Sequence, residues 1–122
     1  MKEINQSPLK AFENAFNGLK YFFLHERNGK IQLSITAMAI LLAVYVGASS
    51  GEWIVILLCI GVVLSLEMLN TAIEKLCDVV QEDYHPSIKI IKDVAASAVL
   101  WISIMSAIIG AIIFIPKLLS IL

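Results

Sequence analysis

Charged residues are scarce in this chain, and neither sign of charge dominates. Asp, Glu, Lys and Arg make up 16% of the 122 residues, against roughly 25% in a typical soluble domain. The formal net charge is −1, so the general electrostatic attraction that nucleic-acid binding needs is missing and no nucleic-acid partner is expected. Hydrophobic residues make up 59% of the chain, which indicates an integral membrane protein.

Several common site types are also missing. Cys59 and Cys77 lie roughly 27 Å apart along one predicted helix, so they cannot pair, and neither has metal-type spacing with a second Cys or His. The chain contains no GxSxG, GxxxxGK[ST] or GxGxxG motif, which argues against the common soluble hydrolase and nucleotide sites. The first thirty residues contain no cleavable signal peptide, so we expect later apolar segments to direct insertion.

Three segments are long enough to cross a bilayer, which takes about 20 apolar residues: 31–50, 53–80 and 92–115. A Gly- and Ser-containing turn at 47–51 separates the first two. Pro86 suits the start of the third helix, and we expect Pro116 to close it. The expected architecture is one all-α membrane domain over residues 1–122.

A different element precedes these spans, at residues 8–27. One narrow face of this helix is apolar and consists of Phe12, Phe16, Leu19 and Phe23, while polar residues occupy the other side. A helix in a soluble core would show the same pattern. Its position directly before a spanning segment favours an amphipathic surface helix that lies in the membrane interface.

Basic residues predict the orientation. Those before the first span are Lys2, Lys10, Lys20, Arg27 and Lys30, and those flanking the loop between the second and third spans are Lys75, Lys89 and Lys92. The turn at 47–52 has none. The positive-inside rule therefore places the N-terminus and the second loop on the cytoplasmic side.

Polar residues form a stripe on the second half of the middle span: Glu67, Asn70, Thr71, Glu74 and Asp78. At 100° per residue they share one sector of the helix. Ionisable groups in a bilayer are costly and usually face a protein interior or a wet cavity. Three carboxylates on one face repel one another unless a cation lies among them, so the stripe suggests a metal at the membrane surface.

Depth separates the members of this stripe. Glu67 follows Trp53 by roughly 21 Å of helix rise, on the cytoplasmic side of the hydrocarbon core, and is best placed to meet a group from the lipid phase. Glu74 lies nearer the cytoplasm, where metal and nucleotide are available. With Lys92 and Asp93 nearby, the set suits phosphoryl transfer: Mg²⁺ takes carboxylates and phosphate oxygens, Lys offsets phosphate charge, and a carboxylate accepts a proton.

Other interpretations remain open at this point. Glu74 and Asp78 could be solvated carboxylates paired with Lys75 or Lys92, and Lys92-Asp93 could be an interfacial anchor. A small multi-span transporter or channel subunit would also bury carboxylates in a bundle. A transport site belongs near the bilayer midplane, however, and three spans offer no inverted repeat, so an enzyme is favoured.

The run EMLNTAIEKLCD, from Glu67 to Asp78, resembles the ExxN[ST]AIExxxD signature of the prokaryotic diacylglycerol kinase family. Supporting matches are NGL at 17–19, ERN at 26–28, DYHP at 83–86 and KDVAA at 92–96. The resemblance implies a multi-pass lipid kinase of the bacterial cytoplasmic (inner) membrane. It also implies a homotrimer with sites between subunits, and ATP and Mg²⁺ as co-substrate and cofactor.

The resemblance also implies roles for individual residues. Glu67 looks like the catalytic base that meets the lipid substrate, and Glu26 and Glu74 look like the metal and nucleotide ligands. The remaining implied cofactor contacts are Lys92 and Asp93 at the phosphates and Asp83, Tyr84 and His85 near the adenine. Asn70 and Asp78 would support the site.

The sequence leaves the identity of the acceptor lipid open between diacylglycerol and undecaprenol. The ERN and YHPxxKIxKDVAA runs look more like the branch typified by undecaprenol kinases. Asn14 and Gln32 replace an aromatic and an acidic residue of the enterobacterial form. Diacylglycerol and undecaprenol each present one primary hydroxyl, and nothing in the stripe distinguishes them.

Overall fold

The computed structural model describes residues 7–122, and those residues form four α-helices without a strand. The helices are α1 (Pro8–His25), α2 (Arg27–Val46), α3 (Ser50–Val80) and α4 (Pro86–Ile121). By length and apolar composition, α2, α3 and α4 can each cross a membrane. The all-α fold with three spanning helices and an N-terminal helix is therefore confirmed. Lys2, used above for orientation, lies outside the described residues.

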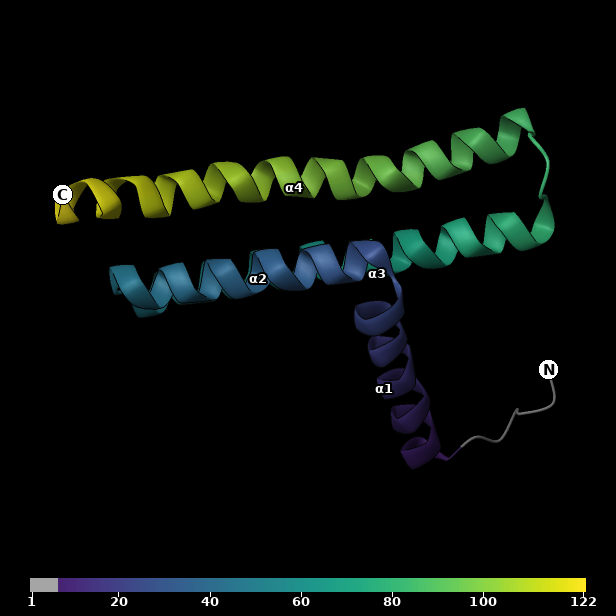
Figure 1. The fold of residues 1–122 in the computed structure, drawn as a ribbon, viewed down its shortest axis with the longest axis horizontal. Helices are drawn as coiled ribbons and strands as arrows, with labels where there is room; N and C mark the ends of the chain where they lie inside the picture. The colour runs from purple at the N-terminus through teal and green to yellow at the C-terminus, as the bar shows by residue number, and fades with distance from the viewer. Residues whose placement is uncertain (1–6) are drawn as a thin grey trace.

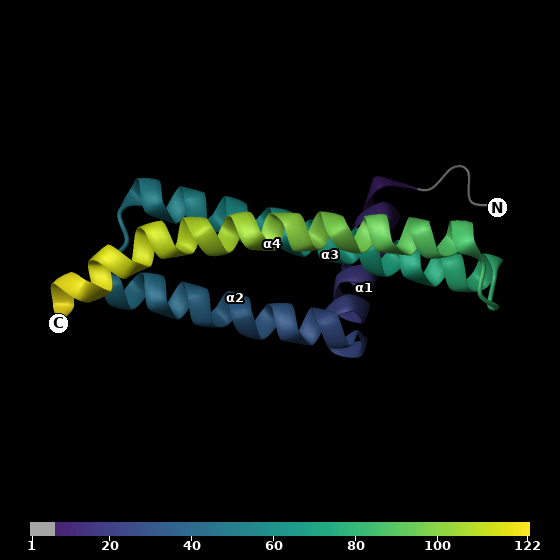
Figure 2. The same cartoon turned by 90° about the horizontal axis from the view of Figure 1, so that it is seen from above.

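The three long helices lie side by side in alternating directions, and α1 runs across them (Figures 1 and 2). The most extensive contact is between α3 and α4, and α2 packs on both. Because the directions alternate, the start of α2, the end of α3 and the start of α4 lie in the same half of the bundle, where α3 and α4 extend beyond α2 (Figure 1). All the predicted site residues come from this half.

The first part of the apolar face of α1 does not pack on the rest of the described chain. Phe12 and Phe16 are 67% and 62% exposed, whereas Phe22, on another side of the helix, is buried. A soluble core helix would bury the first two. The exposed apolar face and the crosswise direction of α1 both agree with a helix that lies in the membrane interface.

Local capping explains where the helices begin and end. Ser49 and Glu52 form a reciprocal capping box at the start of α3, and His85 caps α4, whose first residue is Pro86. Gly47 ends α2 with φ of 69°, a left-handed conformation that favours glycine.

The prediction that Pro116 closes the third helix is wrong. The helix α4 continues through Pro116 to Ile121 and contains 36 residues. Proline cannot donate a backbone hydrogen bond, but membrane helices tolerate it where neighbouring groups compensate. Lys117 Nζ, directly after the proline, lies 3.0 Å from Glu52 Oε1 of α3 and ties the last turns to the bundle. Figure 2 shows these turns bending away from the line of the helix.

The small packed core lies at the end of the bundle opposite the predicted site. Its buried members are Ala43 of α2, Ile56 of α3 and Ile113 of α4, and Trp53 and Phe114 pack around them. Burial of these side chains holds the three helices together at this end. In the other half, the ion pairs Lys75–Glu26 and Lys92–Asp78 link separate parts of the chain.

A sharp corner joins α1 to α2. Glu26 is the single extended residue between the helices, with φ of −98° and ψ of 132°. Its N–H donates to the Phe22 carbonyl, and its carbonyl accepts from Lys30 N. A Cβ on Gly29 would overlap the Phe22 carbonyl oxygen, so the backbones approach too closely for any other residue.

Candidate active site

The polar stripe of α3 divides into a buried part and an exposed part. Glu67 is 4% exposed and Asn70 is 6% exposed, and both face into the bundle. Glu74 and Asp78, further along the helix, are exposed. Since an isolated buried carboxylate is costly, Glu67 needs polar neighbours, and the Asn28 side chain at the start of α2 is one of them.

Two further residues near Glu67 stand out, one that the sequence analysis did not assign and one with an unpaired polar atom. Asn28 was not assigned a role from the sequence, although the ERN run in which it occurs was a usable signal. The buried Oδ1 of Asn70 has no hydrogen-bond partner among the described residues. A buried polar atom without a partner commonly marks a place for a ligand or water.

The corner residue Glu26 lies against α3. Its Oε1 is 2.9 Å from Lys75 Nζ, and the same ammonium lies 5.3 Å from the centre of the Tyr21 ring. The hydrogen bond from Lys75 holds the pKa of the Glu26 carboxyl below its ordinary value of 4.5. Sequence reasoning did not find the Glu26–Lys75 pair, because no local spacing connects residues on different helices.

A second ion pair joins α3 to α4. Lys92 Nζ lies 2.6 Å from Asp78 Oδ1, so the structure brings together two of the predicted site residues. Asp93 lies next to Lys92 in sequence but pairs within its own helix, 2.6 Å from Lys89 Nζ. Both pairs lie on exposed surface at the acid-bearing end of the bundle.

The loop before α4 is exposed at Asp83, Tyr84 and His85. His85 Nδ1 accepts a hydrogen bond from Ser87 N at 3.2 Å and so caps α4. In the part of the chain that the structure describes, no hydrogen bond or ion pair joins these three residues to the other predicted site residues. The loop carries polar and aromatic groups at the far end of α3 and α4 (Figure 1).

The carboxylates suit one kind of metal. Among residues 7–122, no three His, Cys, Asp or Glu side chains are grouped closely enough to enclose a metal ion. Mg²⁺ needs only one or two protein carboxylates when phosphate oxygens and water complete its shell. Among the described residues the acids therefore do not form a metal centre enclosed by the protein, and a Mg²⁺ ion here would need ligands from a nucleotide and water.

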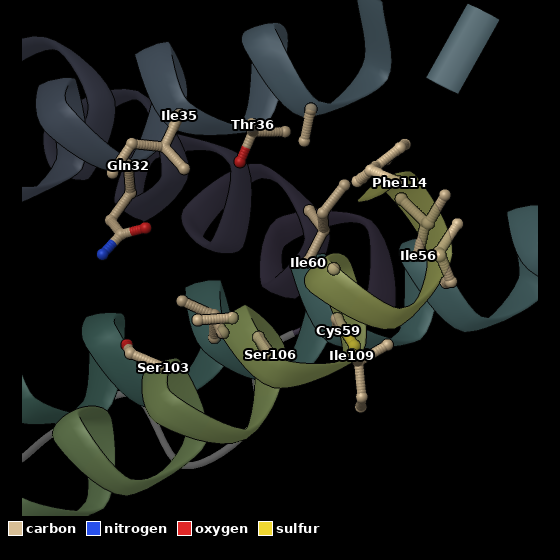
Figure 3. A pocket seen from close by; sticks show the side chains of 15 residues that line it. Gln32, Ile35, Thr36, Ile56, Cys59, Ile60, Ser103, Ser106, Ile109 and Phe114 are labelled. Carbon is tan, nitrogen blue, oxygen red and sulfur yellow. The ribbon is translucent and has the colours of Figure 1, made fainter. Parts of the chain in front are cut away.

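A cavity of about 340 Å³ lies between α2, α3 and α4 (Figure 3). Its walls are mostly apolar, and the residues that line it are Gln32, Ile35, Thr36, Ala39, Ile56, Cys59, Ile60, Val63, Ser103, Ser106, Ala107, Ile109, Gly110, Ile113 and Phe114. Val63 precedes Glu67 by about one helical turn, so the cavity begins beneath the buried carboxylate. Its few polar groups include Ser106 Oγ, which is buried without a partner in the described chain.

Comparison with known proteins matches the sequence to a family. The sequence profile described as "Prokaryotic diacylglycerol kinase" matches residues 13–114. The chain is 39% identical to the undecaprenol kinase of Bacillus subtilis over 109 residues, which cover 89% of both chains. It is 36% identical to the diacylglycerol kinase of Synechocystis, over 93% of this chain and 66% of that protein.

The Helicobacter pylori diacylglycerol kinase is more distant, at 30% identity over 73% of this chain and 70% of that protein. The profile match includes Glu26, the whole polar stripe of α3 and the Lys92-Asp93 pair. The chain belongs to the prokaryotic diacylglycerol kinase family and is a membrane-embedded lipid kinase.

Proposed function

We propose that this protein transfers the γ-phosphate of ATP, with Mg²⁺, to the primary hydroxyl of a membrane lipid, and that undecaprenol is the preferred acceptor over diacylglycerol. The observation that carries the proposal is the burial of Glu67 beside Asn28, with the exposed acids and Lys92 beyond it. A carboxylate in that position lies between the lipid phase and the nucleotide.

Glu67 acts as the general base. Its carboxylate accepts the proton of the lipid hydroxyl while the hydroxyl oxygen bonds to the γ-phosphorus. The bond between this phosphorus and the β,γ-bridging oxygen breaks, and ADP leaves with that oxygen. Asn28 orients the carboxylate, and Asn70, whose Oδ1 is buried without a partner, supports the same side of the site.

The nucleotide lies on the exposed side of the stripe. Glu26 and Glu74 hold the Mg²⁺ ion, which when bound offsets charge on the phosphates. Lys92, held by Asp78, contacts the phosphates together with Asp93. The loop residues Asp83, Tyr84 and His85 lie toward the adenine.

We further propose that the active form is a homotrimer in the inner membrane with the N-terminus in the cytoplasm. Basic residues before α2 and around the loop between α3 and α4 support this orientation. Glu74 is exposed and has no ion-pair partner in the described chain, which supports completion of the site by another subunit. The cytoplasm is also where ATP is available.

The acceptor is inferred from two observations. The ERN and YHPxxKIxKDVAA runs agree with the undecaprenol kinase branch, and the Bacillus subtilis relative matches most of both chains. The apolar cavity beneath Glu67 offers room for part of a hydrocarbon chain whose hydroxyl reaches the carboxylate. A single isoprenoid chain is easier to admit there than two acyl chains.

The test is a phosphorylation assay with the purified full chain in mixed micelles, with radiolabelled ATP, Mg²⁺ and the two lipids separately and in competition. We expect label in both lipid products and a higher kcat/KM for undecaprenol. A higher kcat/KM for diacylglycerol would reverse the acceptor assignment. Absence of label in both lipids would overturn the proposed reaction.

A further inference from the structure

Lys75 has no role in the proposed reaction, yet its ammonium group forms an ion pair with Glu26, one of the proposed metal ligands. We propose that Lys75 occupies the cation position at Glu26 and makes metal binding there depend on the nucleotide. The inference rests on the proposed role of Glu26 as a metal ligand. It adds a residue that sets the metal affinity of the site.

The carboxylate of Glu26 forms an ion pair with Lys75. As the one extended residue between α1 and α2, Glu26 uses only its backbone in capping, and its side chain caps neither helix. The one ion pair found for this carboxylate in the described chain is with Lys75, at 2.9 Å. The Glu26 side chain is 22% exposed, so a cation from solvent can reach it.

The ammonium is held from a second direction. Lys75 Nζ lies 5.3 Å from the centre of the Tyr21 ring, a distance at which a cation is attracted to the ring face. Tyr21 belongs to α1, Glu26 to the corner and Lys75 to α3. Contacts from two other parts of the chain therefore fix the position of the Lys75 ammonium group. Lys75 also directly follows Glu74, the other proposed metal ligand.

Metal and ammonium cannot share this position. Mg²⁺ binds carboxylate oxygen at roughly 2.0–2.1 Å, so an ion on Glu26 would lie within a few ångströms of Lys75 Nζ and be repelled. The lysine side chain is long and flexible, and its charge can leave when another anion is available. The triphosphate of a nucleotide is such an anion. Metal therefore binds weakly alone and more tightly together with nucleotide.

The measurement is Mn²⁺ binding to the purified full chain in micelles, read from the electron paramagnetic resonance of free Mn²⁺, with and without a non-hydrolysable ATP analogue. We expect Lys75→Met to bind Mn²⁺ about tenfold more tightly than the wild type without nucleotide, because a unit charge next to a divalent ion is removed. The gain in affinity from the analogue should shrink correspondingly. Lys75→Arg keeps the charge and should keep the wild-type values.

Lys10→Met is the matched control, because Lys10 forms an exposed pair with Glu13 at 3.6 Å on α1, away from Glu26. It should leave Mn²⁺ binding unchanged. If Lys75→Met is poorly folded, Lys75→Gln provides the same charge removal with a polar side chain. Unchanged or weaker Mn²⁺ binding in both neutral variants would overturn the inference.

Glu26→Gln separates this inference from the proposed function. Loss of Mn²⁺ binding in this variant, together with unchanged binding in Lys75→Met, would reject only the role of Lys75. Wild-type Mn²⁺ binding in Glu26→Gln would reject Glu26 as a metal ligand and with it the basis of the proposal. Tighter binding in Lys75→Met that disappears in the double variant with Glu26→Gln would support both.

Discussion

Lys92 Nζ lies 2.6 Å from Asp78 Oδ1 and thereby joins the start of α4 to the end of α3 across the intervening loop. The side chains are 36% and 64% exposed, and an exposed pair of this kind contributes only about 0–1 kcal/mol to stability. The main effect of the pair is to fix the position of the Lys92 side chain. It holds the lysine at the exposed end of the polar stripe, where the proposed site needs a cation for the phosphates.

A charge exchange tests whether Lys92 acts on the phosphates or only on Asp78. We expect the double variant Asp78→Lys with Lys92→Asp to melt close to the wild type, because an ion pair of opposite direction can form. Its kcat/KM for ATP should fall roughly tenfold to a hundredfold, since a charge-assisted hydrogen bond contributes about 1.5–3 kcal/mol. Thermal melting and steady-state kinetics in micelles provide the two readouts.

The exchange of Lys10 and Glu13, a surface pair on α1, is the control and should change neither readout. Recovery of wild-type kinetics in the Asp78/Lys92 exchange would mean that the pair only supports the structure. Lys92 would then lose its assigned phosphate contact.

Glu67 and Glu74 should separate into two kinetic classes. Glu67→Gln removes the proton acceptor, so kcat should fall by roughly 10²–10⁴ while nucleotide binding is kept. Glu74→Gln should weaken Mg-ATP binding and raise its KM, because Glu74 lies on the exposed side of the stripe. Initial rates over a range of Mg-ATP, combined with binding of a fluorescent nucleotide, distinguish the two effects.

Glu13→Gln, at an exposed position of α1, serves as the isosteric control for both variants. Turnover retained in Glu67→Gln would remove the assignment of Glu67 as base. An unchanged KM in Glu74→Gln would remove Glu74 from the metal and nucleotide ligands.

The sequence predicted those parts of the fold that depend on local composition. Uncharged segments long enough to cross a bilayer can only be helices, because every backbone group must be paired within the segment. The burial of Glu67 followed from its place after a long uncharged run. The continuation of α4 past Pro116 did not, since proline usually ends a helix, and the contact of Lys117 with Glu52 in this region joins residues of separate helices.

The contacts within the candidate site were harder to predict. Helical spacing placed Glu67 and Asp78 on one face, and the sequence offered Lys75 or Lys92 as partners for the exposed acids without choosing between them. The pairs Asp78–Lys92 and Glu26–Lys75 are created by the packing of separate helices. The cavity beneath Glu67 has the same origin, with walls from three helices.

The corner at Gly29 should be intolerant of substitution. A Cβ there would overlap the Phe22 carbonyl oxygen, and a backbone atom cannot rotate away as a side chain can. We expect Gly29→Ala to destabilise the protein by about 1–3 kcal/mol, the usual cost of overpacking, and to displace Glu26. Chemical denaturation in micelles measures the first effect, and the KM for Mg-ATP reports the second.

Gly18 is the matched control on α1, because a Cβ at this position meets nothing within 4 Å. Gly18→Ala should stabilise the helix by roughly 0.5–1 kcal/mol, since alanine has the better helix propensity. Equal stability in the two variants would mean that α1 and α2 can separate at the corner without cost.

The cavity gives a last prediction, which concerns the lipid alone. Ala39 lines the cavity on α2, whereas Ala37 on the same helix is exposed and does not line it. Ala39→Phe fills part of the space, so the KM for the lipid should rise severalfold while the KM for Mg-ATP stays unchanged. Ala37→Phe adds the same side chain outside the cavity and should alter neither value.

The two variants make the same Ala-to-Phe change in the same helix, so a difference in lipid KM between them reports the filling of the cavity. A larger effect of Ala39→Phe on undecaprenol than on a short-chain alcohol acceptor would support occupancy by the hydrocarbon chain, because the short acceptor does not need the space. Equal lipid KM values for both variants and both acceptors would contradict it. The lipid would then meet Glu67 from the outer face of the bundle.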